Sequence, residues 1–211
     1  MKKTVSALLL LLLLSGCGAP ASVPPPTDSP SNTSQNEPSS ANEDVFLEFT
    51  AKDFDGNEID HSIFANTKLT MMNVWATFCS PCVTEMPELG ELAAVGGTDY
   101  QIIGVCADLD NTAEMLQEAK DIVAETGANY VHLQPSESLL PVLTATSAVP
   151  VTFFFDSEGK LVGQGVMGAR DKSGWEKELK ARLEAVHTAA QEKDAAATPE
   201  STEDSSDAAA Q

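Results

Sequence analysis

Two cysteines three residues apart form the part of this sequence best suited to chemistry. Cys79 and Cys82 lie in the stretch FCSPCVTEMP, residues 78–87. Such a pair can be half of a metal site, a short structural disulfide, or a redox-active dithiol. The chain has four cysteines, and the other two, Cys17 and Cys106, are distant in sequence. The surrounding sequence therefore has to distinguish the three kinds of site.

The alternatives to a redox dithiol find little support around the pair. A structural zinc ion needs four ligands, and the chain has no second Cys-x-x-Cys pair and only three scattered histidines. A permanent disulfide across so few residues closes too small a loop to stabilise the fold through chain entropy. A peroxide-reducing site has its attacking cysteine in a Thr-x-x-Cys frame, whereas Thr77 is only two residues before Cys79. A redox dithiol is therefore favoured.

The pair is expected where a buried strand passes into a helix. The run LTMMNVW at 69–75 is mostly apolar, as in a buried strand, and residues 81–95 follow with helical spacing up to two glycines. Cys79 would then lie at the helix N-terminus, where unpaired N–H groups and the macrodipole favour a thiolate. Cys82 would lie one turn further on the same face and be less exposed. This predicts Cys79 as the attacking sulfur and Cys82 as the resolving one.

Strands and helices are expected to alternate through residues 44–187. Two short strands should flank the turn Asp55-Gly56-Asn57, and a hairpin turn at 156–159 should join strands 151–155 and 161–166. A capping box at Ser173–Glu176 should open a last helix that ends near His187. Further strands are expected at 101–107 and 129–133, and further helices at 112–126 and 137–144. The order predicts an α/β sandwich with a mixed sheet.

Both ends of the chain are expected to lie outside this domain. Residues 1–16 have a basic start, a leucine-rich core too short to span a membrane, and small residues before Cys17, which is typical of an export signal. Leu-Ser-Gly-Cys resembles a bacterial lipobox, so Cys17 would be lipidated and would become the first residue of the mature protein. Plain secretion is the alternative. Residues 17–43 are expected to form a lipid-anchored disordered tether. Residues 188–211 are expected to form an acidic disordered tail.

The charge of the chain excludes some partners. The formal net charge is −20, from 12 Lys and Arg against 32 Asp and Glu. Nucleic acids and anionic membrane surfaces are bound through clustered basic side chains. Neither is therefore expected as a partner, and association with a membrane is expected through the lipid anchor alone.

The segment NVWATFCSPCVTEMP resembles the active site of the TlpA/ResA-like group of tethered thiol–disulfide oxidoreductases. The resemblance extends over residues 44–187. It implies a thioredoxin-like three-layer sandwich with a mixed central sheet and an N-terminal β-hairpin. It also implies a helical insertion, residues 108–147, between the middle strands. The only redox centre implied is the Cys79–Cys82 disulfide, with no further cofactor and no metal.

The resemblance implies roles for further residues. Pro150 matches a cis-proline beside the disulfide, whose preceding residue would offer its backbone to a substrate strand. Glu85 matches a glutamate of the ResA-like proteins and could take the proton from Cys82, its pKa being raised in an apolar setting. A solvated helix carboxylate is the alternative. Two positions depart from thioredoxin, because Asn73 replaces a buried aspartate and Phe78 replaces a tryptophan. Cys106 is expected to be structural.

The expected activity is exchange with protein thiols and disulfides at the extracytoplasmic face of the cell membrane. Ser80 and Pro81 between the cysteines include no basic residue that would further stabilise a thiolate, which favours a reductant. Proteins of this group receive electrons from a membrane donor such as a CcdA/DsbD-like protein. They pass them to apocytochrome c or to oxidised repair enzymes. A disulfide-donating oxidant and a non-catalytic metal- or peptide-binding lipoprotein remain as alternatives.

Overall fold

The computed structural model describes residues 45–145 and 147–197. Contacts divide the chain into two units, residues 1–41 and 42–211, and the fold described below belongs to the second. The expected signal peptide, residues 1–16, and the whole expected tether, residues 17–43, including Cys17, lie outside the described residues. No helix within the described ranges is long and apolar enough to cross a membrane.

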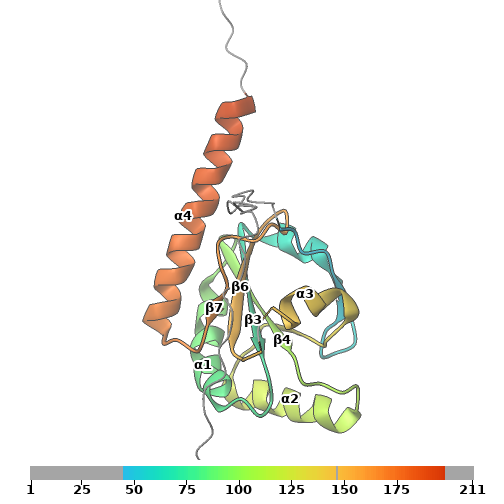
Figure 1. Cartoon of the computed structure of the whole chain (residues 1–211). Coiled ribbons are helices and arrows are strands. Elements are labelled where there is room, and N and C mark those ends of the chain that lie inside the picture. The colour runs from blue at the N-terminus through green and yellow to red at the C-terminus, as the bar shows by residue number, and fades with distance from the viewer. Residues whose placement is uncertain (1–44, 146, 198–211) are drawn as a thin grey trace, which may run out of the picture. The chain divides into compact units, whose positions relative to one another are not determined.

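A five-stranded mixed sheet forms the middle layer (Figure 1). Its strands are β3 (Leu69–Trp75), β4 (Tyr100–Cys106), β5 (Val131–Leu133), β6 (Val151–Asp156) and β7 (Val166–Met167), in the spatial order β5-β4-β3-β6-β7. The first three are parallel to one another, whereas β6 and β7 run antiparallel to their neighbours. The predicted mixed sheet is confirmed, with the strand that precedes the cysteines at its centre.

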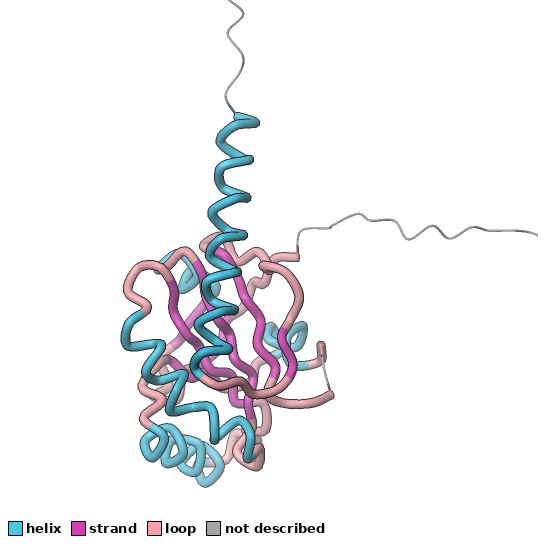
Figure 2. The backbone as a smooth tube through the Cα atoms, turned by 90° about the vertical axis from the view of Figure 1, so that its left-hand side faces the viewer, coloured by secondary structure: helices cyan, strands magenta, loops and turns pink. Residues whose placement is uncertain are grey.

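Helices and a hairpin cover the two faces of this sheet (Figure 2). One face packs against α1 (Ser80–Val95), α2 (Ala113–Thr126) and α4 (Lys172–Ala197). The other is covered by the hairpin of β1 (Thr50–Lys52) and β2 (Glu58–Asp60), the 3₁₀ helices η1 (His61–Asn66) and η2 (Glu137–Leu139), and α3 (Leu140–Leu143). The three-layer sandwich, the N-terminal hairpin and the insertion between β4 and β6 agree with prediction.

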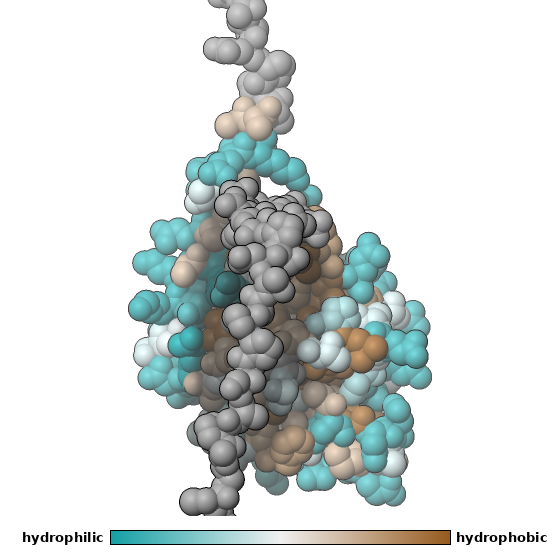
Figure 3. Space-filling view, in the orientation of Figure 1, coloured by the Kyte–Doolittle hydropathy of each residue, from teal (hydrophilic) through white to brown (hydrophobic). Residues whose placement is uncertain are grey.

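Successive side chains of β3 point to opposite faces of the sheet and so contribute to two hydrophobic clusters, one on each face. Met72 and Val74 pack into the cluster beneath the hairpin, and Trp75 packs into the cluster beneath α1 and α2. All seven residues of β3 are buried, as expected for a central strand with both faces covered. In the view of Figure 3, hydrophilic side chains lie along the flanks and hydrophobic ones toward the middle. The cysteines that follow β3 therefore start from a rigid support.

Helix α2 begins and ends as its sequence predicts. Thr112 is the N-cap and its hydroxyl accepts a hydrogen bond from the backbone N–H of Met115 (3.3 Å). Gly127 ends the helix in the left-handed conformation, at φ 68°, which glycine adopts without steric cost. These local signals allowed the sequence to predict the helix at 112–126, within one residue of its observed start.

The strand expected at 161–166 is mostly a loop. Leu161 forms an isolated bridge with Phe155, and regular pairing with β6 resumes only at Val166. Arg182 of α4 explains the difference, because its guanidinium donates to the carbonyl oxygens of Val162 (2.6 Å) and Gln164 (3.0 Å). A side chain from a distant helix thus takes the acceptors that a neighbouring strand would have used.

The predicted bounds of the last helix were also wrong. Asp171, rather than Ser173, caps it, since Asp171 Oδ1 accepts from the backbone N–H of Gly174 (2.8 Å). The helix continues to Ala197, ten residues beyond His187. Residues 188–197 are rich in alanine, the strongest helix former. This helix propensity outweighs the polar composition from which disorder was predicted. The first ten residues of the expected disordered tail are therefore helical.

Candidate active site

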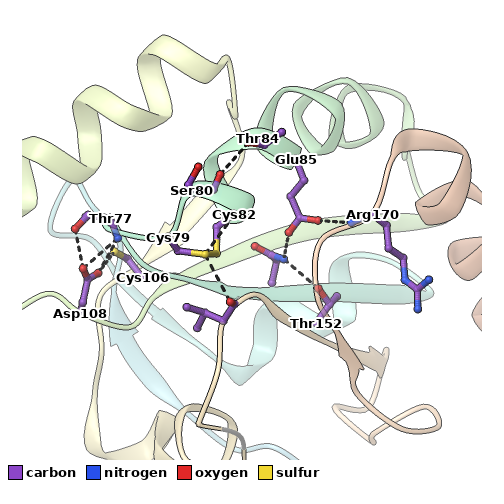
Figure 4. The surroundings of a disulfide bond; sticks show 12 residues. Thr77, Cys79, Ser80, Cys82, Thr84, Glu85, Cys106, Asp108, Thr152 and Arg170 are labelled. Carbon is purple, nitrogen blue, oxygen red and sulfur yellow. Dashed lines mark hydrogen bonds between the residues drawn. A yellow bond between two sulfur atoms is a disulfide. The ribbon is translucent and has the colours of Figure 1, made fainter.

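A disulfide joins Cys79 and Cys82 at the N-terminus of α1 (Figure 4). Cys79 is the N-cap residue, and its sulfur accepts a hydrogen bond from the backbone N–H of Cys82 (3.3 Å). The helix begins here because Cys79 has extended backbone angles and Pro81 stands in the first turn, where its missing N–H costs nothing. The helix N-terminus thus directs the backbone N–H of Cys82 at the sulfur predicted to carry a thiolate.

The two sulfurs differ in access to solvent. Cys79 is 5% exposed and Cys82 is fully buried, so an incoming thiolate reaches Cys79 first. The carbonyl oxygen of Val149 lies 3.6 Å from Cys79 Sγ. The Val149–Pro150 peptide bond is cis, as the resemblance implied. The predicted residues Cys79, Cys82 and Pro150 therefore lie together, from segments about 70 residues apart.

Glu85 projects from the same side of α1 as Cys82 and is only 3% exposed (Figure 4). Oε1 accepts from the amide nitrogen of Asn73 (3.1 Å). Oε2 accepts from the backbone N–H of Arg170 and from the indole N–H of Trp175, both at 3.0 Å. This carboxyl group is not a solvated helix carboxylate. Within the described ranges it hydrogen-bonds to neither cysteine.

The pKa of Glu85 is raised by its surroundings. Burial is the largest cause, and it outweighs the N–H groups of Arg170, Trp175 and Asn73, which favour the charged form. Sequence reasoning had placed Glu85 near the cysteines but missed Arg170 and Trp175, which follow it by 85 and 90 positions. A single sequence contains no local signal for such pairing.

A second polar group holds the loop before Cys79. Asp108, just after β4, accepts from the backbone N–H and the hydroxyl of Thr77, the latter at 2.7 Å. The thiol of Cys106 donates to the same carboxylate (3.2 Å), and its pKa is raised by burial and by Asp108. Cys106 is fully buried, in agreement with the structural role expected for it. Across the described ranges, no group of three or more His, Cys, Asp or Glu side chains is placed to bind a metal.

Two exposed hydrophobic side chains belong to segments connected to the site, one before Cys79 in the chain and one on the strand beside Val151. Phe78, immediately before Cys79, is 77% exposed, and Met167 of β7 is 64% exposed. Met167 pairs with Val151, the residue after Pro150, and the backbone N–H of Gly168 donates to Pro150 O (2.9 Å). We call Phe78, Val149, Pro150 and Met167 the apolar rim.

Solved structures share this fold. A thiol:disulfide interchange protein of the thioredoxin family from Chlorobium tepidum TLS superposes with a TM-score of 0.56 at 19% identity, over 65% of this chain and 94% of that one. The exposed lipoprotein thioredoxin of Streptococcus pneumoniae strain TIGR4 gives 0.50 at 28% identity, over 64% and 98%. The fold is therefore thioredoxin-like, as predicted.

Sequence comparison defines the class. The chain is 31% identical over 120 residues to the thiol:disulfide interchange protein DsbE of Pseudomonas fluorescens biotype C, covering 56% of this chain and 62% of that one. It is 28% identical over 134 residues to the thiol-disulfide oxidoreductase ResA of Bacillus thuringiensis (strain Al Hakam), covering 63% and 73%. Fold, site and relatives together define a thiol–disulfide oxidoreductase of the thioredoxin superfamily. The chain belongs to the AhpC/TSA family, which matches residues 43–164.

Proposed function

We propose that this protein is an extracytoplasmic reductant of protein disulfides, tethered to the cell membrane. The main support for a reductant, as opposed to an oxidant, is the hydrogen bonding of the two cysteines. Within the described part of the chain, neither sulfur receives a hydrogen bond from a Lys, Arg or His side chain, and the contact from Cys82 N–H (3.3 Å) is a neutral one. A strong oxidant requires a stabilised reduced form. A site with little thiolate stabilisation therefore favours a low potential.

The proposed reaction proceeds through a mixed disulfide. The thiolate of Cys79 attacks a client disulfide, one client sulfur leaves as a thiolate, and Cys79 becomes bonded to the other. The thiolate of Cys82 then attacks Cys79 Sγ, which releases the second client sulfur and closes the internal disulfide. Glu85 assists by taking the proton of Cys82, because a carboxylate whose pKa is raised is a stronger base than an ordinary carboxylate.

The apolar rim is the proposed docking surface for the client. Phe78 and Met167 would cover hydrophobic side chains of an extended segment, and the Val149 carbonyl 3.6 Å from Cys79 Sγ would accept a client N–H. Pro150 holds this carbonyl beside the sulfur. Client classes in keeping with the resemblance are oxidised repair enzymes and apocytochrome c, with a CcdA/DsbD-like membrane protein as the electron donor.

The proposed location depends on the N-terminus. Residues 1–16 would direct export, and lipidated Cys17 would anchor the protein at the outer face of the cell membrane. The similarity to an exposed lipoprotein thioredoxin supports this arrangement. The test is membrane fractionation of the full chain against Cys17→Ser. The variant is expected in the soluble extracytoplasmic fraction, and its retention on the membrane would contradict lipid anchoring.

The first experiment is the reduction potential of the Cys79–Cys82 pair in the full chain. Trp75 is buried in one cluster with both cysteines, so its fluorescence should follow the redox state. A value near −270 mV would support a reductant, and one near −120 mV would indicate a disulfide donor instead. The absence of a reversible transition would exclude exchange through this pair and would favour a non-catalytic binding lipoprotein. Cys79→Ser is the control without a transition.

A further inference from the structure

The side-chain carbonyl of Asn73 is a buried acceptor that lacks a hydrogen-bond partner among the described residues. Asn73 lies in the middle of β3 and is 1% exposed. Its amide nitrogen donates to Glu85 Oε1 (3.1 Å) and to Thr152 Oγ1 (3.0 Å). The carboxylate fixes this orientation, because turning the amide would place one acceptor against another. A buried acceptor without a partner is unusual and calls for an explanation.

The position of Asn73 relates it to the resolving cysteine. Cys82 and Glu85 are three residues apart on α1, so their side chains point to the same side of the helix, as Figure 4 shows. Asn73 is hydrogen-bonded to Glu85 from the strand below, and Cys82 is fully buried against the same face of the sheet. The amide of Asn73 therefore lies beneath the first turns of α1.

The redox state decides whether Cys82 can be a donor. In the disulfide, Cys82 Sγ is bonded to Cys79 and carries no hydrogen. In the dithiol it carries one, and the thiol can then donate a weak hydrogen bond to a nearby acceptor. We propose that the carbonyl oxygen of Asn73 accepts a hydrogen bond from the Cys82 thiol, and that this bond exists only in the reduced protein.

This inference rests on the proposed thiol–disulfide exchange. A reducing partner with two thiols transfers two electrons to the Cys79–Cys82 disulfide. The partner becomes a disulfide, the S–S bond of this protein breaks, and two protons end on Cys79 and Cys82. The proton on Cys82 makes the bond to Asn73, which stabilises the dithiol form. When Cys82 later attacks the mixed disulfide, this bond is given up and the proton leaves Cys82.

A competing donor lies nearby. The hydroxyl of Tyr130 is also buried and lacks a hydrogen-bond partner within the described ranges. Its pKa is raised by burial first and by the charge of Glu85 second, and the second cause places the hydroxyl near the same carboxyl group. A bond from Tyr130 to Asn73 would form in both redox states. Only a donor on Cys82 would make the Asn73 carbonyl respond to reduction, and this difference allows a direct test.

The test is vibrational spectroscopy of the Cys82 thiol. In the full chain with Cys17→Ser, Cys79→Ala and Cys106→Ala, Cys82 is the remaining thiol, and its S–H stretching band reports the hydrogen bond. We expect Asn73→Leu to shift this band to higher frequency. Thr152→Val, which removes the other neutral partner of the same amide but keeps the carbonyl, should leave the band unchanged. An unchanged band in Asn73→Leu, or an equal shift in Thr152→Val, would overturn the inference.

A second measurement needs no substitution, in case Asn73→Leu fails to fold. With ¹³C-labelled asparagine in the unmodified chain, reduction should shift the side-chain carbonyl signal of Asn73 downfield, while that of the exposed Asn66 stays in place. No shift at Asn73 on reduction would overturn the inference.

The effect on the redox equilibrium can be measured separately. Asn73→Leu should favour the disulfide about fivefold relative to the unmodified chain in glutathione buffers, which corresponds to ~20 mV at 29.6 mV per tenfold. An unchanged or reversed equilibrium would count against the inference. A pair without any redox transition would instead contradict the proposed function, so the two failures are distinguishable.

Discussion

The carboxyl group of Glu85 is subject to two opposing influences. Burial disfavours its charge, whereas three N–H donors favour it, and burial prevails, so its pKa is raised. A carboxyl group whose folded pKa exceeds its unfolded value stabilises the protein at pH values below the unfolded value. That contribution is lost as the pH rises through the folded value. A residue that costs stability near neutral pH is more readily explained by chemistry than by folding.

Glu85→Gln should slow the second step of exchange. The amide has the same shape but cannot accept the Cys82 proton, so the rate of mixed-disulfide resolution at neutral pH should fall roughly tenfold or more. Stopped-flow measurement with a labelled mixed disulfide at Cys79 would give this rate. Glu91→Gln, at an exposed position of the same helix, is the control. Equal rates in the two variants would remove Glu85 from the mechanism.

Replacing Phe78 should slow the reaction with protein disulfides but not the reaction with small disulfides. It is far more exposed than hydrophobic residues usually are, and covering it with a client would contribute about 1.5–3 kcal/mol. Phe78→Ser should therefore lower kcat/KM for a protein disulfide roughly tenfold or more, and leave the rate with a small disulfide unchanged. Val95→Ser alters a comparably exposed side chain at the other end of α1. If both variants behave alike with a protein client, the rim is not a docking surface.

At the scale of elements, the close contact between α1 and the end of α2 depends on Gly90. A Cβ on Gly90 would lie far inside van der Waals contact with the carbonyl oxygen of Gly127. Alanine in a helix is favoured over glycine by about 1 kcal/mol, but overpacking against backbone costs about 1–3 kcal/mol. We expect Gly90→Ala to be destabilising in urea unfolding, because the atom that the new Cβ would meet belongs to the backbone of Gly127 and not to a flexible side chain.

A reference variant in the same helix separates the two effects. Ala94 is exposed, so Ala94→Gly changes helix propensity with little change in packing. It should lower the free energy of unfolding by about 1 kcal/mol. A stabilised Gly90→Ala protein would show that α1 and α2 can move apart, contrary to the tight contact described.

Elements with strong local signals were predicted well. β3 was predicted at 69–75 and occupies those residues, and α2 begins at the residue after its threonine cap. Where tertiary contacts decide, prediction failed. Arg182 prevents a full strand after Leu161, and Asp171 takes the cap expected of Ser173. At the site, the cysteines and the cis peptide before Pro150 were foreseen from motif and resemblance.

At the scale of the whole molecule, His132 makes stability depend on pH. Burial lowers its pKa to about 4, and its Nε2 lies 3.0 Å from the carbonyl oxygen of Ala128. The unfolded chain binds a proton near pH 6.5 and the folded one only near pH 4. The stability that His132 contributes is therefore present above pH 6.5 and is lost as the pH falls toward 4, by up to about 3 kcal/mol.

Urea unfolding at several pH values would measure this dependence. In His132→Gln, the loss of stability between pH 6.5 and 4 should be smaller than in the unmodified chain by about that amount. His61→Gln, at an exposed position, should keep the original dependence. Identical pH profiles for His132→Gln and the unmodified chain would show that folding does not shift the pKa of His132.

The hydrogen bond from Cys106 to Asp108 limits side reactions of the third cysteine during thiol–disulfide exchange. A third thiol able to reach Cys79 or Cys82 could attack a mixed disulfide and divert the exchange into an internal side product. Cys106 is buried, its thiol is engaged by a carboxylate, and its pKa is raised, so it provides almost no thiolate. Within the described domain, thiol–disulfide exchange is therefore confined to the single pair Cys79 and Cys82.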